Sequence, residues 1–332
     1  MSLRHHASTV RLLVGAAGIW LTLAPDVGAQ TRARAGAADP ASARTPWGDP
    51  DLQGTWTNMT MTPFERPDKF ANRTTLTDEE LASLDAEAAR SADLPPTKGQ
   101  TGAYNEFWFE RGKRLNQASL IVDPQDGKLP ALTPEGRKLQ ATIAQVRTNP
   151  PASPEDLSLF ERCITRSLPG AMMPAFYNHN YQIVQSPGYV MIYVEMIHDV
   201  RIIPTDGRPH LNPSIRQWLG DSRGRWEGNT LVVETTSLKP ARELRPSRAV
   251  YGGGEKLKVV ERFTRVDAKT IDYRFTVTEP DLFSKPWTAS TPMSSTEGQI
   301  FEYACHEGNH AIANMLRGAR QAEREAAEAA KR

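Results

Sequence analysis

The 332-residue sequence has few cysteines, almost no excess charge and no long apolar run. Its 40 basic and 39 acidic residues argue against nucleic acid as a partner, because phosphate binding needs a basic surface. The main apolar run, Leu12 to Ala24, is too short to cross a bilayer comfortably, so no membrane span is predicted. Gly-rich phosphate loops, C-x-x-C and haem-attachment motifs do not occur, and we expect no nucleotide, zinc-ribbon or c-type haem cofactor.

The first 29 residues have the features of a secretory signal peptide. Arg4 and Arg11 provide a positive start, the apolar run follows, and residues 27–29 (Val-Gly-Ala) offer a small-x-small cleavage site. Because these residues include two arginines and one aspartate, the rest of the chain is formally neutral. We predict a signal peptide over 1–29, a linker over 30–45, and a periplasmic or secreted protein.

The sequence has two cysteines, Cys163 and Cys305, and in an exported chain an even number of cysteines favours disulfide pairing. A bridge between them would join the beginning of the predicted β domain to its end. The sequence therefore favours a disulfide, and a reactive thiol is the alternative.

Residues 46–160 form a mixed, Pro-rich segment with two predicted helices. One follows Thr77, which forms a capping box with Glu80, and the other spans 134–147 and begins on Pro134. The chain after Ala311 is also predicted to be helical, and in its last part, 317–332, it lacks an apolar stripe.

From about Tyr181 the sequence changes to short β-rich runs separated by turn signals. Residues 270–278, TIDYRFTVT, alternate cleanly between apolar and polar side chains, as in a half-buried strand. We count eight or nine such runs, among them 189–204 as one strand, SIRQWLGDS at 214–222 and QIFEYA at 299–304. The fold class predicted is mainly β: an antiparallel up-and-down, lipocalin-like barrel over 161–316, with room for one small ligand.

Three stretches carry a family resemblance: PWGDPDLQGTW, HDVRIIPTDGRPHLNPSIRQWLGDSRGRWEGNTLVVET and YACHEGNHAIANMLRGAR. Together they resemble a widespread group of exported proteins of environmental bacteria, over roughly residues 46–320. The resemblance implies export and a mainly β C-terminal domain, and it implies no particular activity.

The run 189–204 concentrates ionisable groups among apolar ones, which is costly to bury unless they pair or line a wet pocket. Taken as one strand, it places Tyr193, Glu195, Asp199 and Arg201 on one face and His198 on the other, unless a bulge intervenes. We predict an acid–base site in which Glu195 or Asp199 is the base and His198 a proton shuttle. Arg201 and Tyr193 would then hold an anionic or carbonyl oxygen. The alternative is a core histidine beside an internal Asp–Arg ion pair.

Further ligand contacts are predicted at His179, Trp218 and His306. Aromatic side chains at a barrel mouth suit an apolar or aromatic ligand, although core packing would also explain them. His210 is another candidate for a pocket or a metal, but no spacing demands either.

Two short motifs offer other chemistry. His306-Glu307-Gly308-Asn309-His310 spells the H-E-x-x-H of zinc proteases, which needs both histidines on one helix face. Gly308 and Asn309 are poor helix residues and no third ligand is evident, so a helix cap is the favoured interpretation.

Gly220 to Gly224 fits the G-x-S-x-G of serine hydrolases, with Ser222 as the nucleophile. That motif needs a helix to follow, whereas the next residues predict another strand, so a hairpin turn is favoured.

The sequence as a whole predicts an exported β-barrel protein that binds a small apolar or aromatic molecule. Acid–base catalysis of lyase, isomerase or hydrolase type, without a cofactor, is a further hypothesis. The alternatives are a non-catalytic envelope binding or structural protein, and a zinc-dependent hydrolase using His306, Glu307 and His310.

Overall fold

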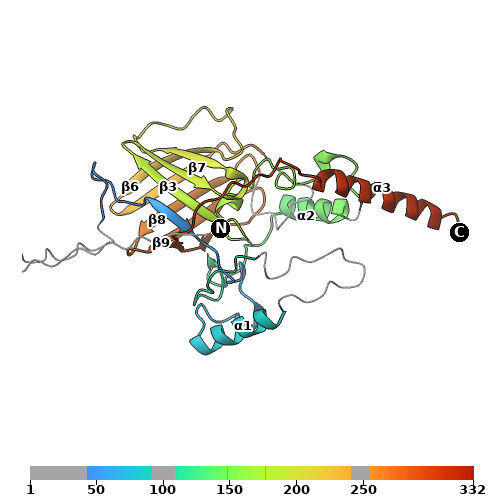
Figure 1. The fold of residues 1–332 in the computed structure, drawn as a ribbon, viewed down its shortest axis with the longest axis horizontal. Coiled ribbons are helices and arrows are strands. Elements are labelled where there is room, and N and C mark those ends of the chain that lie inside the picture. The colour runs from blue at the N-terminus through green and yellow to red at the C-terminus, as the bar shows by residue number, and fades with distance from the viewer. Residues whose placement is uncertain (1–42, 92–108, 148, 176, 241–253) are drawn as a thin grey trace, which may run out of the picture. The chain divides into compact units, whose positions relative to one another are not determined.

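An antiparallel sheet of eleven strands, curved into a nearly closed barrel, dominates the structure (Figure 1). The computed structural model describes residues 43–91, 109–147, 149–175, 177–240 and 254–332. The predicted signal peptide and most of the predicted linker lie outside these ranges. The predicted mainly β, barrel-like fold is confirmed.

The strands pair in the order β5-β4-β3-β1-β11-β9-β8-β7-β6, and β10 joins β9 to β2. Their bounds are β1 Gly54–Thr57, β2 Ile121–Asp123, β3 Asn180–Ser186, β4 Tyr189–Val194, β5 Val200–Pro204, β6 Asp221–Glu227, β7 Thr230–Thr236, β8 Lys258–Arg265, β9 Thr270–Thr278, β10 Trp287–Ser290 and β11 Met293–Ser295.

Two of these strands, β1 and β2, come from the segment predicted to be helical and irregular. Strand β1 pairs with β3 through Trp56 and Tyr181, and with β11 through Trp56 and Ser295. The sheet therefore departs from a simple up-and-down order, because an N-terminal strand is inserted between β3 and β11.

The barrel nearly closes where β6 passes β5. A Cβ atom on Gly224 of β6 would lie 2.8 Å from a methyl of Thr205 and 2.9 Å from one of Ile203. Glycine at this position permits the close approach of the two strands.

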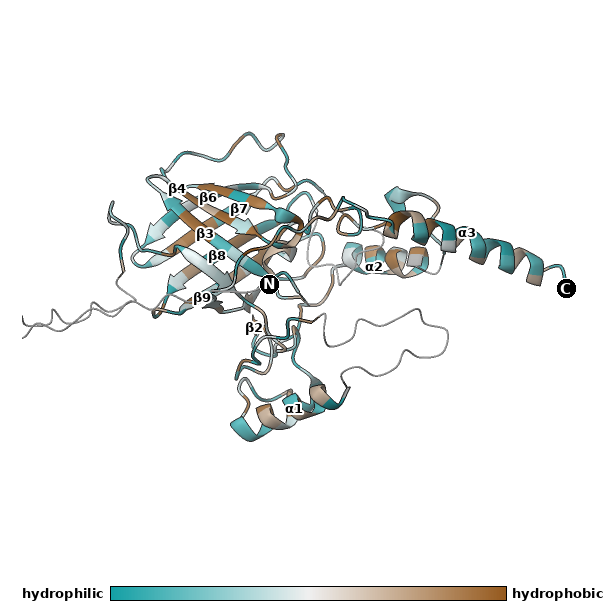
Figure 2. Cartoon of the chain, viewed as in Figure 1, coloured by the Kyte–Doolittle hydropathy of each residue, from teal (hydrophilic) through white to brown (hydrophobic). Residues whose placement is uncertain are grey.

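The alternation of apolar and polar side chains along the strands determines which of them face the barrel interior. Ile271, Tyr273, Phe275 and Val277 of β9 are all at most 1% exposed, as the sequence pattern predicted. Figure 2 shows that hydrophobic residues are frequent along the strands of the sheet. Turns predicted after β3, β6 and β8 join those strands to their partners.

Three helices accompany the sheet: α1 Asp78–Ser91, α2 Pro134–Arg147 and α3 Ala311–Ala329. The capping box of α1 is confirmed, because the Thr77 N–H donates to Glu80 Oε2 at 2.9 Å and the Glu80 N–H to Thr77 Oγ1 at 3.3 Å. The second half of α3 is exposed and largely hydrophilic (Figure 2). Among the described residues, none of the helices has the length and apolar character that a bilayer crossing requires.

The prediction of one strand over 189–204 was wrong. Strand β4 ends at Val194, a short 3-10 turn spans Met196–His198, and β5 begins at Val200. Ile197 and His198 have φ of 62° and 46°, and these left-handed residues reverse the chain. Tyr193 consequently pairs with Val200 on the outer face, so the predicted row of four ionisable side chains does not exist.

Two other predicted strands are also absent. Residues 214–220 form turns before β6, and residues 299–304 have no regular structure.

A candidate binding site at one end of the barrel

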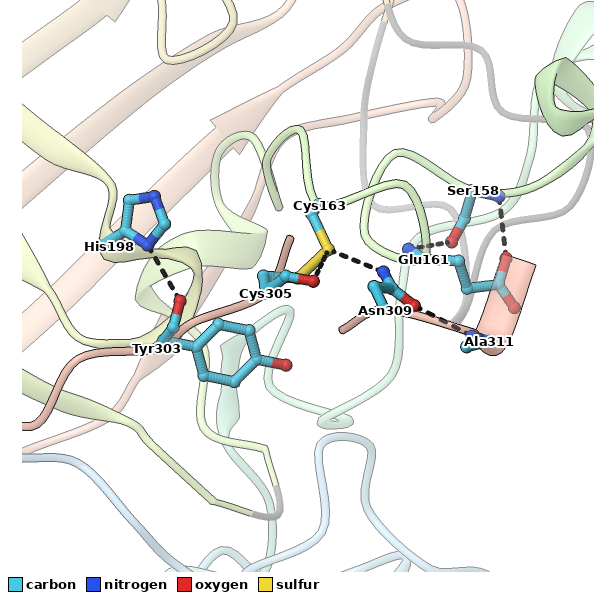
Figure 3. The surroundings of a disulfide bond; sticks show 8 residues. All are labelled: Ser158, Glu161, Cys163, His198, Tyr303, Cys305, Asn309 and Ala311. Atoms are coloured by element: carbon cyan, nitrogen blue, oxygen red, sulfur yellow. Dashed lines mark hydrogen bonds between the residues drawn. A yellow bond between two sulfur atoms is a disulfide. The ribbon is translucent and has the colours of Figure 1, made fainter. Parts of the chain in front are cut away.

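Most of the predicted site residues gather at the end of the barrel where β3 begins, β4 ends and β5 begins, and Arg201 and His306 are the exceptions. Two segments contact this end, residues 158–172 and residues 299–306, and we call it the covered end. The disulfide between Cys163 and Cys305 joins the two segments, as predicted (Figure 3).

Three consecutive residues of the first covering segment contact three predicted site residues. Thr165 Oγ1 donates to Asp199 Oδ2 at 2.9 Å. Arg166 Nη1 lies 2.7 Å from His179 Nε2, and Ser167 Oγ donates to the Trp218 carbonyl oxygen at 3.1 Å. No sequence signal predicts these contacts, because residues 165–167 have no periodic pattern or motif.

The second covering segment is held by the β4–β5 turn. His198 Nδ1 lies 3.0 Å from the Tyr303 carbonyl oxygen, next to the disulfide (Figure 3). Since a carbonyl oxygen only accepts, Nδ1 carries the proton here. His198 is otherwise exposed, so in this structure it anchors a covering segment.

Glu195 is buried, with 1% of its surface exposed, and both of its carboxylate oxygens are engaged. Oε2 accepts from Asn180 Nδ2 at 2.7 Å, and Oε1 from the Phe301 N–H at 2.9 Å. These bonds tie β3, the β4–β5 turn and the covering segment together. A carboxylate held in this way positions its neighbours more readily than it takes up a substrate proton.

Burial raises the pKa of the Asp199 carboxyl above its ordinary value, and the hydrogen bond from Thr165 only partly opposes this. Burial also raises the pKa of Tyr193 and of Glu110, and the nearby charge of Glu195 adds to both shifts. Tyr193 and Glu110 therefore lie near Glu195, and Asp199 ends the same β4–β5 turn that Glu195 begins. Such clustering is typical of functional sites.

His179 is fully buried and its tautomer is fixed by its neighbours. Arginine only donates hydrogen bonds, so Nε2 must accept from Arg166 and Nδ1 must carry the proton. Nδ1 lies 3.4 Å from the hydroxyl of Tyr181, which donates to Asn58 Oδ1 at 3.2 Å. A polar chain therefore leads from the covered end into the barrel.

Arg201 does not reach the covered end. It forms a two-pronged ion pair inside the barrel with Glu261 of β8, at 2.8 Å between Nη1 and Oε1, and Tyr273 Oη donates to the same carboxylate at 2.8 Å. Burial is the largest single influence and acts to lower the pKa of Arg201, but the charge and hydrogen bonds of Glu261, together with Tyr273 and Tyr181, outweigh it and the pKa is raised. Burial and the same carboxylate raise the pKa of Tyr273.

Glu261 was missed by the sequence reasoning, although a signal existed. It shares the parity of Val259 and Phe263, which are both fully buried, and a charged residue in such a row predicts an internal partner.

Backbone strain concentrates at the covered end. The described residues other than glycine with positive φ occur in the first covering segment, before β3, in the β4–β5 turn and after β7. They are Cys163, Ser167, Asn178, Ile197, His198 and Ser237. Conformations of this kind persist where the surroundings enforce them, and they are common at functional sites.

Half-buried aromatic residues also occur in the segments at this end. Phe160 of the first covering segment, Tyr177 before β3 and Tyr303 of the second covering segment all pack against the core. Trp218 is half-buried, with Lys239 Nζ 4.4 Å from its ring centroid.

The two catalytic motifs lack the geometry that their chemistry requires. His306 lies in a turn with Gly308 at φ 64°, and α3 begins only at Ala311, so His306 and His310 do not share a helix face. His306 is exposed and so is not packed against the barrel. Ser222 lies within β6 and bonds to Thr235, with another strand following. Within the described ranges, no group of three His, Cys, Asp or Glu residues is placed to hold a metal ion.

Comparison with protein-family models, with curated proteins and with solved structures found no match. The fold and the residues of the covered end are therefore the only basis for a proposed function.

Proposed function

We propose that this chain is an exported protein that binds a small apolar or aromatic molecule at the covered end of its barrel. The observation that carries the proposal is the presence of half-buried aromatic residues and buried polar groups in the segments that form one end of the barrel. Ligand sites combine a mostly apolar lining with a few fixed polar groups, and the ends of β-barrels are a common place for them.

Acid–base chemistry on the bound molecule is the finer part of the proposal. Asp199 would transfer the proton, because its carboxyl is half-buried with a raised pKa and contacts Thr165 and the backbone of Arg166. Glu195 and His198 would act as positioning residues through their bonds to the covering segment. Arg166 would face an anionic or carbonyl oxygen of the ligand.

Binding can be tested with a panel of phenols, aryl ketones and benzoates, by thermal shift and then calorimetry. Trp218→Leu should weaken the binding of a responding compound at least tenfold. Trp47→Leu is the matched control, because Trp47 lies in the turn beside Arg44, which contacts Asn229 at the other end of the barrel. Absence of saturable binding, or equal loss in both variants, would overturn the proposal.

Catalysis is tested separately on a compound that binds. Asp199→Asn should abolish its conversion while changing its Kd less than about threefold, as expected for a group that acts in the transition state. Binding without conversion in the unmodified protein would leave the non-catalytic alternative.

A further inference from the structure

The outer face of strands β3, β4 and β5 carries a contiguous apolar surface, which we call the apolar face. Val184, Met191 and Ile202 stand directly opposite one another in one row across the three strands. In the next row Tyr193 stands opposite Val200. All five side chains point outward, because their neighbours along each strand are buried.

This face exposes more apolar surface than single surface residues do. Among the described residues, the two most exposed large apolar side chains are Phe301 and Ile202, at 64% and 63%. The Phe301 N–H bonds to the residue that follows β4, so Phe301 lies at one end of the face. Val200, Tyr189 and Val184 are also exposed. Together they present on the order of 500 Å², the size of patch that marks a contact surface.

The two end strands of the hydrogen-bonded path, β5 and β6, differ in what they turn outward. Strand β6 presents charged residues, Arg223, Arg225 and Glu227. Charges of this kind commonly keep the edges of a sheet from associating with other chains. Strand β5 presents Val200 and Ile202 instead. The usual protection is therefore in place on β6 and missing on β5, which indicates that the apolar face has a protein partner.

We propose that this partner is a second copy of the chain, seated on the apolar face by two-fold symmetry about Met191. In a two-fold interface the same patch serves both subunits, so the patch must complement itself. Tyr189 and Tyr193 lie two residues to either side of Met191 on β4. The symmetry axis therefore sets Tyr189 against the partner's Tyr193.

The charges at the two ends of the face fit the same arrangement. Burial, Glu195 and Glu302 together raise the pKa of Tyr193, which places Glu302 near that ring. At the other end, Arg208 donates to the Tyr189 hydroxyl at 2.7 Å and remains 46% exposed beside Asp206. The two-fold axis brings Glu302 to the partner's Arg208, and does so twice in each dimer.

The area of the face also suits a dimer. A stable interface of standard size buries about 800 Å² on each partner, of which somewhat more than half is apolar. The apolar face supplies an apolar area of this order. The dimer needs no contribution from the covered end, so it is independent of the proposed ligand.

Sedimentation velocity of the full, tag-free chain at micromolar concentrations should show a dimer. Ile202→Glu places a charge at the centre of the interface and should raise the dimer Kd at least about a hundredfold, because the charge is buried without a partner. Val266→Glu is the matched control, since Val266 is 47% exposed in the turn after β8, several strands from the face, and should dimerise as the parent does.

Charge reversal tests how the two copies are oriented, without relying on the apolar contacts. Glu302→Arg and Arg208→Glu should each raise the dimer Kd about tenfold, because each acts at two symmetry-related contacts. The double variant should return to the parent value, which a loss of folding could not produce. Failure of the double variant to recover would contradict the two-fold arrangement.

Two further results would overturn the proposal. A dimer that persists unchanged in Ile202→Glu would have to use another face. A protein that stays monomeric at all concentrations, and floats with phosphatidylcholine vesicles unless Ile202 is replaced by glutamate, would have a lipid surface as the partner of this face.

Discussion

The buried Arg201–Glu261 pair illustrates at the residue scale how the barrel tolerates charge in its interior. The side chains are 1% and 0% exposed, and neither could be buried alone. Glu261→Leu should therefore destabilise the fold by about 3–5 kcal/mol, because it leaves an uncompensated cation. Urea unfolding measures this loss directly.

The double variant Arg201→Met, Glu261→Leu is the matched control for that loss. It removes both charges together and should recover most of the stability, since apolar replacements of a buried pair are often neutral. If the stability losses of the two single substitutions simply added up in the double variant, the broken ion pair would not be the cause of the loss in Glu261→Leu.

Asp199 gives a pH dependence whose sign follows from its raised pKa. The folded state binds this proton more tightly than the unfolded state, in which the pKa is about 3.9. Its contribution to stability is therefore present at acid pH and is lost as the pH rises through the folded-state pKa. Asp199→Asn, which cannot ionise, should gain stability over the parent protein as pH increases from about 4 to 7.

Unfolding free energies of the two proteins at several pH values test this prediction. If the stability advantage of Asp199→Asn over the parent protein shrank with rising pH, the pKa of Asp199 would be lowered in the folded state.

At the scale of single elements, sequence patterns predicted helices better than turns. Helix α2 was expected over the range in which it occurs, and α1 was expected from its capping box, because caps and proline positions are local signals. The β4–β5 turn was missed since nothing local indicates a left-handed isoleucine. Ile197 takes that conformation only because the surrounding structure enforces it. This one turn decides which candidate residues meet, and the structure brings only some of the predicted site residues together.

The position of the covering segments likewise depends on a contact between residues far apart in the sequence, the disulfide. Cys163 and Cys305 are 142 residues apart, and removing a bridge over so long a loop should cost about 2–5 kcal/mol. In Cys163→Ala, Cys305→Ala, thermal unfolding should shift down, and the Phe301 amide should exchange faster with solvent. Asn309→Ala is the control, because it removes the side-chain bonds of Asn309 to Cys163 Sγ and to the Ala311 N–H but leaves the disulfide in place. Unchanged exchange at Phe301 would show that its bond to Glu195 holds the segment without the bridge.

At the scale of the whole molecule, the N-terminal strand unites segments that the sequence suggested were separate. Trp56 on β1 is 1% exposed and contacts the core between β3 and β11. Trp56→Ala should therefore destabilise the entire barrel by about 3–5 kcal/mol. Trp47→Ala, nine residues earlier at a 37% exposed position, should cost well under 1 kcal/mol. Chemical denaturation of both variants compares them, and similar losses would mean that β1 is not integral to the core.

The pairing of β1 with β11 also sets the order of events during folding. Trp56 and its partner Ser295 lie far apart in the sequence, so the gap between β3 and β11 cannot be filled until β11 has been synthesised. Contacts this distant in sequence form late and slowly. We therefore expect the sheet to stay open in the nascent chain until β11 is available, and an open sheet is one that can still be unravelled and threaded through a narrow channel.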